Sequence, residues 1–317
     1  MIDILRLVLQ SLVIAIFISG LIGWCRVARF CFALRLQNQG SSGLLDSLIP
    51  CSRQERPTWT FADFLLAFGL RILLPVLLLS LMADEASIGE GQAAISLHTD
   101  QAVEIAGELG PGAQNSVSTE SAIAQLSLQL IAIFASIGLT LAWLSILHRD
   151  SWKRIGFRTN WKQVHLALIS TPLILSVVMI FSLIGSAIVE YQHPVLDALS
   201  QQTSPTFWSL TFFVTAIATP IFEEFVFRGL LQGSLQALAD RQVDQGDWKP
   251  KALWPLLVSS FIFAIMHFPG QGAAPLPIFA LSIGLGYLYR QTGSLIPPIL
   301  VHVILNSITL LEAYTGQ

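Results

Sequence analysis

Long apolar runs, separated by short polar or charged stretches, recur along this chain of 317 residues. A helix that crosses a bilayer needs about 20 mainly apolar residues, and eight runs approach or exceed that length. We expect them at residues 4–24, 62–82, 122–147, 164–189, 207–231, 253–268, 276–289 and 295–311. The pattern predicts an all-α fold, a polytopic membrane bundle of about eight transmembrane helices.

Basic residues fall in alternate loops of this predicted bundle. Of the 17 Lys and Arg residues, 14 lie in the first, third, fifth and seventh loops, whereas the second and fourth loops contain none. Cytoplasmic loops are enriched in Lys and Arg, so the alternation places both termini outside. The second loop, residues 83–121, carries seven carboxylates and is expected to be a flexible, acidic, non-cytoplasmic excursion.

Composition argues against a soluble protein and against a nucleic-acid partner. Hydrophobic residues make up 53% of the chain and charged residues 12%, whereas about 25% of the residues of a soluble domain are charged. The high apolar fraction makes membrane lipid the expected partner. The net charge of −3 offers no electrostatic attraction for nucleic acid. The cysteines Cys25, Cys31 and Cys51 are odd in number and lie toward the predicted cytoplasmic side, so we expect free thiols.

The fifth apolar run contains two adjacent carboxylates and an arginine, and such charges within a bilayer are usually paired or functional. Glu224 and Arg228 are one helical turn apart and are predicted to form an ion pair. Glu223 points about 100° away from Glu224 and lacks that partner, so it is the candidate general base. Arg71, in the middle of the second run, is expected to be structural, either paired with Asp63 or reaching to the membrane surface.

Two further runs carry polar side chains four residues apart. Phe263 and His267 lie in the sixth run, and His302 and Asn306 lie in the eighth. A single histidine in an apolar helix is usually a packing residue. Two imidazoles, an amide and an ionisable carboxylate on three C-terminal runs instead indicate one functional cluster.

Together these motifs resemble those of a known family. Glu223-Glu224-x-x-x-Arg228, Phe263-x-x-x-His267 and His302-x-x-x-Asn306 are similar to the signature motifs of the CAAX prenyl protease and bacteriocin-processing (CPBP, or Abi) family of intramembrane endopeptidases. The resemblance covers about residues 160–312. It implies a division into N-terminal transmembrane helices, 1–160, which include the acidic loop 83–121, and a catalytic transmembrane domain, 161–317. It implies that Glu223 activates water, that Glu224, Arg228 and Phe263 support the site, and that His267, His302 and Asn306 are catalytic groups that hold the water and stabilise the oxyanion.

The resemblance leaves the cofactor open, because family members are described both as metalloproteases and as metal-independent glutamate proteases. One carboxylate and two imidazoles are a known catalytic zinc set. If a divalent metal such as zinc is present, its expected ligands are therefore Glu223, His267 and His302. The His-Glu-x-x-His spacing of the common zinc proteases is absent from these motifs.

Three functions are compatible with a polar cluster in a membrane bundle. The resemblance implies an endopeptidase that cleaves a membrane-associated protein, either of the prenylated CAAX type or a leader peptide, in a bacterial plasma membrane or an organellar membrane. A non-proteolytic scaffold or immunity protein could retain the cluster for binding. A proton-coupled transporter is a weaker hypothesis, because the two halves of the chain share no repeat with matching motifs.

Overall fold

The computed structural model describes residues 2–36, 44–52, 54–85, 119–148, 154–157, 160–188, 204–242, 248–267 and 275–316. Within these ranges every regular element is a helix, which confirms the predicted all-α class. Nearly all of the acidic segment predicted at 83–121 lies outside the described residues.

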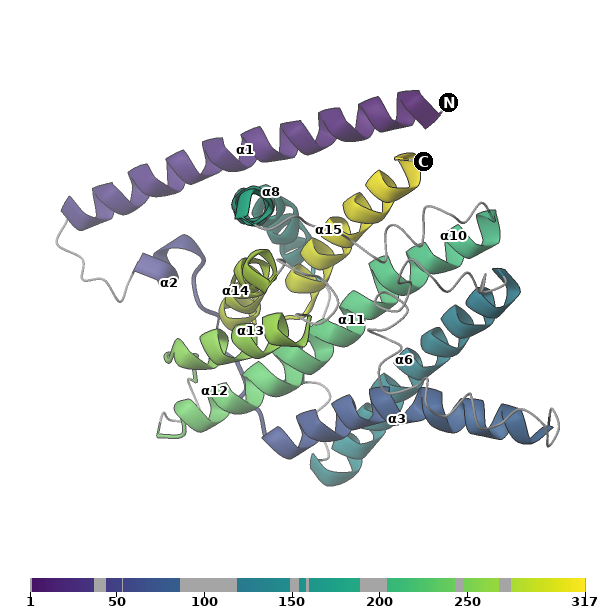
Figure 1. The fold of residues 1–317 in the computed structure, drawn as a ribbon. Coiled ribbons are helices and arrows are strands. Elements are labelled where there is room, and N and C mark those ends of the chain that lie inside the picture. The colour runs from purple at the N-terminus through teal and green to yellow at the C-terminus, as the bar shows by residue number, and fades with distance from the viewer. Residues whose placement is uncertain are drawn as a thin grey trace.

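Each of the eight predicted runs coincides with a helix (Figure 1). These are α1 (Ile2–Leu36), α3 (Phe61–Glu85), α6 (Thr119–His148), α8 (Trp161–Ile188), a continuous run from α10 to α12 (Pro205–Ala239), α13 (Trp254–Met266), α14 (Pro275–Thr292) and α15 (Ile296–Thr315); the short α2 (Leu44–Leu48) follows α1. Six of the eight, all except α13 and α14, are long and apolar enough to cross a membrane. The chain is therefore a multi-pass integral membrane protein.

The helix from Pro205 to Ala239 changes type along its length and is longer at both ends than the predicted 207–231. It consists of α10 (Pro205–Thr211), the π-helical η2 (Phe212–Ala218), α11 (Thr219–Glu224), the π-helical η3 (Phe225–Gln232) and α12 (Gly233–Ala239). Ser204 caps its start by accepting a hydrogen bond from the Phe207 N–H at 3.4 Å. Pro205 occupies the first helical position, where no N–H is needed. Every residue of η3 is buried, so this helix is the core of the bundle.

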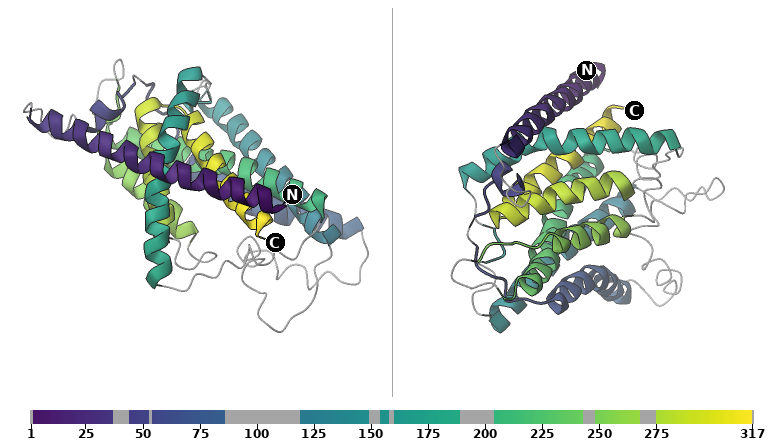
Figure 2. Two further views of the ribbon diagram at one scale, coloured as in Figure 1. Left: turned by 90° about the horizontal axis from the view of Figure 1, so that it is seen from above. Right: turned by 90° about the vertical axis from the view of Figure 1, so that its left-hand side faces the viewer.

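Other helices pack around this core helix in layers, seen edge-on in the right-hand view of Figure 2. α3 and α6 cover one side of it, and α13, α14 and α15 cover the other. α8 packs on α14 and α15, and α1 lies outermost on α8. The segment with Glu223 and Glu224 is thus enclosed between two helical layers.

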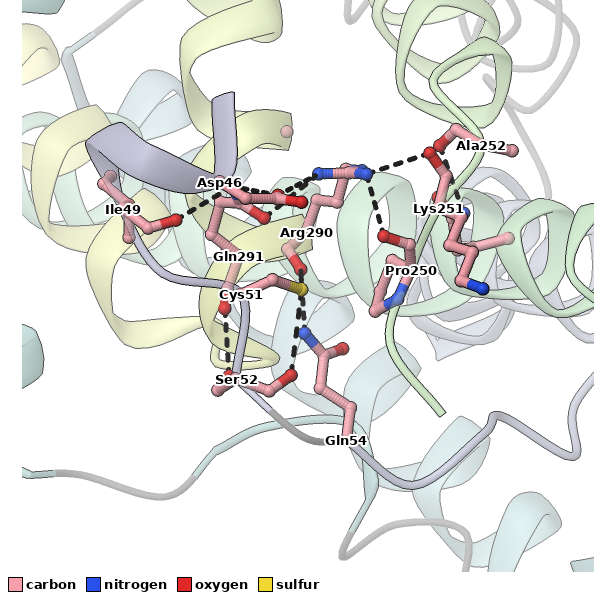
Figure 3. Close-up of polar contacts among 12 residues, drawn as sticks. Asp46, Ile49, Cys51, Ser52, Gln54, Pro250, Lys251, Ala252, Arg290 and Gln291 are labelled. Carbon is pink, nitrogen blue, oxygen red and sulfur yellow. Dashed lines mark hydrogen bonds and ion pairs between the residues drawn. The ribbon is translucent and has the colours of Figure 1, made fainter. Parts of the chain in front are cut away.

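Segments from the first, fifth and seventh predicted loops meet at one end of the bundle (Figure 3). Arg290, near the end of α14, donates through Nη2 to the carbonyl oxygens of Pro250 (2.8 Å) and Lys251 (2.9 Å). Its Nη1 lies 3.6 Å from Asp46 Oδ1, and Gln54 Nε2 donates to the Arg290 carbonyl oxygen at 2.7 Å. One arginine thereby joins three chain segments through charge-assisted hydrogen bonds.

The third predicted loop lies at the same end. Arg154 Nε donates to Glu55 Oε2 at 2.8 Å, and the Leu295 N–H donates to the Gly156 carbonyl oxygen at 3.0 Å. Gly156 has φ +101°, and a Cβ there would lie 2.4 Å from Gly293 O, so only glycine fits this crossing. The described parts of all four predicted basic loops therefore meet at one end of the bundle.

Among the three cysteines, which are all free as predicted, Cys51 lies in the contact network of Figure 3. Its Sγ lies 3.8 Å from the Arg290 carbonyl oxygen. Burial raises the pKa of the Cys51 thiol, so the reactive thiolate is disfavoured near neutral pH.

Candidate active site

The predicted ion pair of the core helix is present and is sealed from solvent. Arg228 Nε lies 3.0 Å from Glu224 Oε2, and the two side chains are 1% and 0% exposed. Arg228 Nη2 also donates to Ser282 Oγ of α14 at 2.9 Å, and the guanidinium carbon lies 4.5 Å from the centroid of the Phe263 ring. The pair therefore ties the core helix to α13 and α14.

Glu224 has a second partner, which sequence reasoning missed. His302 Nδ1, from α15, lies 2.9 Å from Glu224 Oε1. An ionised carboxylate only accepts hydrogen bonds, so the Nδ1 atom carries the proton and Nε2 is turned the other way. Glu224 thus orients His302 in addition to neutralising Arg228.

His267 is oriented in the same manner by a backbone carbonyl. It immediately follows α13, which ends at Met266, so the predicted run 253–268 extends slightly beyond the helix. His267 Nδ1 lies 2.7 Å from the Phe263 carbonyl oxygen, one turn earlier. Because a carbonyl only accepts, Nδ1 is the donor and Nε2 is directed away from the helix.

The Nε2 atoms of the two histidines converge on Glu223. His267 Nε2 lies 3.5 Å from Glu223 Oε1, and His302 Nε2 lies 3.6 Å from Glu223 Oε2. Glu223 is 17% exposed and His267 22%, whereas Glu224 is fully buried. Of the two adjacent carboxylates, only Glu223 is therefore within reach of another molecule.

Phe263 lies beneath both imidazole rings. Its ring centroid is 4.5 Å from that of His267 and 6.1 Å from that of His302, and it meets the Phe227 ring edge-on at 5.0 Å. The Phe263 side chain is 1% exposed. Phe263 therefore packs against both imidazoles, and its supporting role, implied by the resemblance, stays a prediction.

Asn306 binds the core helix one turn before α11. Its Nδ2 donates to the Thr215 carbonyl oxygen at 3.0 Å. In the π-helical η2 a carbonyl oxygen accepts the N–H five residues later, as Val214 O accepts the Thr219 N–H. The corresponding partner of the Thr215 carbonyl would be residue 220, but Pro220 has no N–H. Asn306 therefore supplies the donor that Pro220 lacks, and its second amide hydrogen remains for another acceptor.

This pairing yields a testable coupling between two distant residues. We expect Asn306→Ala to destabilise the bundle by about 1–3 kcal/mol, because it leaves the Thr215 carbonyl oxygen without a donor. In the Pro220→Ala background a backbone N–H is restored, so the same change should cost less than half as much. A double-mutant cycle of unfolding in detergent micelles measures the coupling. Equal costs of Asn306→Ala in both backgrounds would contradict it.

Three polar side chains outside the motifs hold the π-helical backbone next to the site. Trp59 Nε1 donates to Gly229 O, and Ser259 Oγ donates to Phe227 O, each at 2.9 Å. Gln232 Nε2 donates to Gly286 O, also at 2.9 Å. π-Helical segments often occur at functional sites. Polar residues in or beside an apolar run, Ser259 and Gln232, were the signal in the sequence for these contacts. Which carbonyl each one binds is decided by the packing of the helices.

The predicted metal ligands are neighbours, but they do not form a metal site in this conformation. Among the described residues, no group of three or more His, Cys, Asp and Glu side chains has an arrangement that could hold a metal ion. The contacts of Glu223 with His267 and His302, at 3.5 and 3.6 Å, are long for hydrogen bonds. The ligand set Glu223, His267 and His302 stays a prediction.

A separate cavity of about 610 Å³ opens between the segment 55–61 and α12. Arg56, Arg154 and Arg241 lie in its wall, and it shares no residue with the Glu223 cluster. The candidate active site is therefore identified by converging polar groups and their exposure rather than by the size of a cavity.

Comparison with known proteins gave one family match. A family model described as Type II CAAX prenyl endopeptidase Rce1-like matches residues 205–308. The matched segment begins with the core helix and contains Glu223, His267, His302 and Asn306. No curated protein and no solved structure matches the chain.

Proposed function

Because residues 205–308 place this chain in the CPBP family of CAAX-type proteases, we propose that it is an intramembrane endopeptidase in which Glu223 activates the attacking water. The observation that carries this proposal is the orientation of both imidazoles toward the exposed carboxylate. His267 Nε2 and His302 Nε2 each face one oxygen of Glu223, at 3.5 and 3.6 Å.

The first step is attack by water. Glu223 takes one proton from the water as the hydroxide oxygen adds to the scissile carbonyl carbon, and the carbonyl electrons move to its oxygen. His267 Nε2, whose lone pair faces the same space, accepts the second water hydrogen as a hydrogen bond. Together the two groups hold the water in the orientation needed for attack.

The second step is collapse of the tetrahedral intermediate. The remaining amide hydrogen of Asn306 and, in its protonated form, His302 Nε2 are the donors for the oxyanion. Protonated Glu223 then gives its proton to the leaving nitrogen as the C–N bond breaks. The products are an amine and a carboxylic acid, which passes its proton to the amine or to water, and Glu223 is again ionised.

Position in the bilayer limits the substrate to a chain that enters the membrane. Glu223 lies 16 residues before Ala239, the end of the core helix, which corresponds to about 24 Å along its axis. A peptide bond must therefore reach well into the hydrocarbon region. A membrane-associated protein, of the prenylated CAAX type that the family description names or a leader peptide, meets this requirement.

Comparing membrane peptides from cells that express the wild type or Glu223→Ala tests the proposal. We expect the wild type to yield two peptides that abut at one bond, and the variant to accumulate the intact precursor. Glu312→Ala, which removes an exposed carboxylate of α15, is the matched control and should behave as the wild type. Unchanged processing in Glu223→Ala cells, at normal expression and insertion, would contradict catalysis and favour a scaffold.

A further inference from the structure

Arg71 places a charge in the middle of α3, on the face that packs into the bundle. Phe64 and Ala67 are 6% and 0% exposed, and Arg71 continues this stripe at helical spacing. The neighbouring Ile72 and Leu73 are 45% and 64% exposed and face the lipid. The Arg71 side chain is partly buried, so it is directed toward the other helices.

Neither structural role expected for Arg71 is found. Both carboxylate oxygens of Asp63 are occupied, Oδ1 by Trp143 Nε1 at 3.0 Å and Oδ2 by Thr60 N at 2.7 Å. Arg71 makes no hydrogen bond or ion pair with any residue that the structure describes. It also lies 10 residues after Phe61, the first residue of α3, or about 15 Å from that end of the helix. Side chains that reach the membrane surface lie near helix ends.

The packing of α3 on the core helix brings Arg71 to the level of the active site. The Phe64 ring meets the Phe227 ring edge-on at 5.8 Å, at the end of the bundle where the basic loops gather. Arg71 follows Phe64 by seven residues in α3, and Glu223 precedes Phe227 by four residues in the core helix. Because the two helices run in opposite directions, both residues lie on the same side of the ring contact, about 10 Å and 6 Å from it along the helix axes. Consistent with this placement, the Glu223 carboxylate is close enough to act electrostatically on the Arg71 guanidinium.

Among the described residues Arg71 forms no ion pair: Glu224 is bound to Arg228 and His302, and Glu223 faces the two histidines and is the proposed proton acceptor. A guanidinium binds carboxylates through two parallel hydrogen bonds, and the attraction is strong where water is scarce. The one charge that the C-terminal part of any peptide must carry into the bilayer is its α-carboxylate. We propose that Arg71 binds the C-terminal carboxylate of the substrate, on the leaving side of the scissile bond.

This inference rests on the proposed function and makes Arg71 a specificity residue for chains that end a few residues beyond the cleaved bond. It comes from α3, which lies outside the matched segment 205–308. The proposed chemistry of the matched segment would then be combined with substrate selection by an N-terminal helix.

The test uses one membrane-anchored peptide that the wild type cleaves, synthesised with a free C-terminal carboxylate and with a C-terminal carboxamide. In proteoliposomes the wild type should prefer the acid by about 10- to 100-fold in kcat/KM, the range of one charge-assisted contact. Arg71→Gln should lose that preference through a higher KM for the acid, with cleavage of the amide unchanged. Arg71→Lys should restore part of the preference, and Arg241→Gln, an exposed arginine, should retain all of it.

Three results would overturn the inference, with thermal melting of each variant measured in parallel to confirm folding. An equal fall for both peptides in Arg71→Gln would assign the residue to the oxyanion or to positioning of Glu223. Unchanged kinetics for both would show that it has no role in recognition. Equal cleavage of acid and amide by the wild type, abolished by Glu223→Gln, would leave the proposed function standing and remove the carboxylate contact.

Discussion

Glu223→Gln is expected to lower the rate of peptide hydrolysis by about 10²–10⁴-fold, the usual contribution of a positioned general base. Glutamine has nearly the same shape as glutamate and preserves the packing between the two imidazoles, but its amide cannot take a proton from water. Since Glu223 is outside the buried ion pair, the variant should remain folded. The effect should therefore appear in kcat, with little change in thermal stability.

Single-turnover cleavage in proteoliposomes measures this effect directly. In H₂¹⁸O, hydrolysis by the wild type should place one labelled oxygen in the new C-terminal carboxylate. Glu312→Gln, the same chemical change at an exposed position of α15, should cleave at the wild-type rate. A Glu223→Gln variant that retains wild-type turnover would exclude Glu223 as the base, whatever its effect on substrate binding.

The second large effect is expected on stability and concerns the neighbouring pair. We expect Arg228→Met to cost about 3–5 kcal/mol, because it leaves the Glu224 carboxylate buried with its main counter-charge removed. Glu224→Gln should cost a comparable amount, since it strands the Arg228 guanidinium and weakens the hydrogen bond to His302. The free energy of unfolding in mixed detergent micelles is the appropriate measurement.

The chain provides a matched control for this prediction. Arg154 and Glu55 form an ion pair of similar length, 2.8 Å, but their side chains are 28% and 67% exposed. Arg154→Met should therefore cost less than about 1 kcal/mol. A similar loss for Arg154→Met and Arg228→Met would contradict the view that burial, rather than contact distance, decides the contribution of the pair.

The difference between Glu223 and Glu224 explains why two adjacent carboxylates take separate roles. Glu224 is bound by an arginine and a histidine in a sealed environment, which suits the predicted supporting role. Glu223 faces the Nε2 atoms of two histidines and remains accessible. The same helix thus carries one structural and one proposed reactive acid, separated by about 100° of rotation.

What the sequence determined by itself lies within single helices. The lengths of the apolar runs predicted the spans, and their loop charges predicted which loops share a side. The i, i+4 spacing predicted the Glu224–Arg228 pair, because helical geometry fixes the distance between those positions whatever surrounds them. The three motifs also predicted the family, which the match over residues 205–308 confirms.

Only the tertiary structure decided which groups meet between helices, because those contacts depend on how each helix is rotated and displaced against its neighbours. His302 could have faced either glutamate, and packing places its Nδ1 on Glu224 and its Nε2 toward Glu223. Asn306 donates to the Thr215 carbonyl, which in the π-helical register has no N–H partner at Pro220. The spacing of residues along the sequence does not predict this contact. Arg71 was likewise expected to pair with Asp63 or to reach the membrane surface, whereas packing gives Asp63 the partners Trp143 and Thr60.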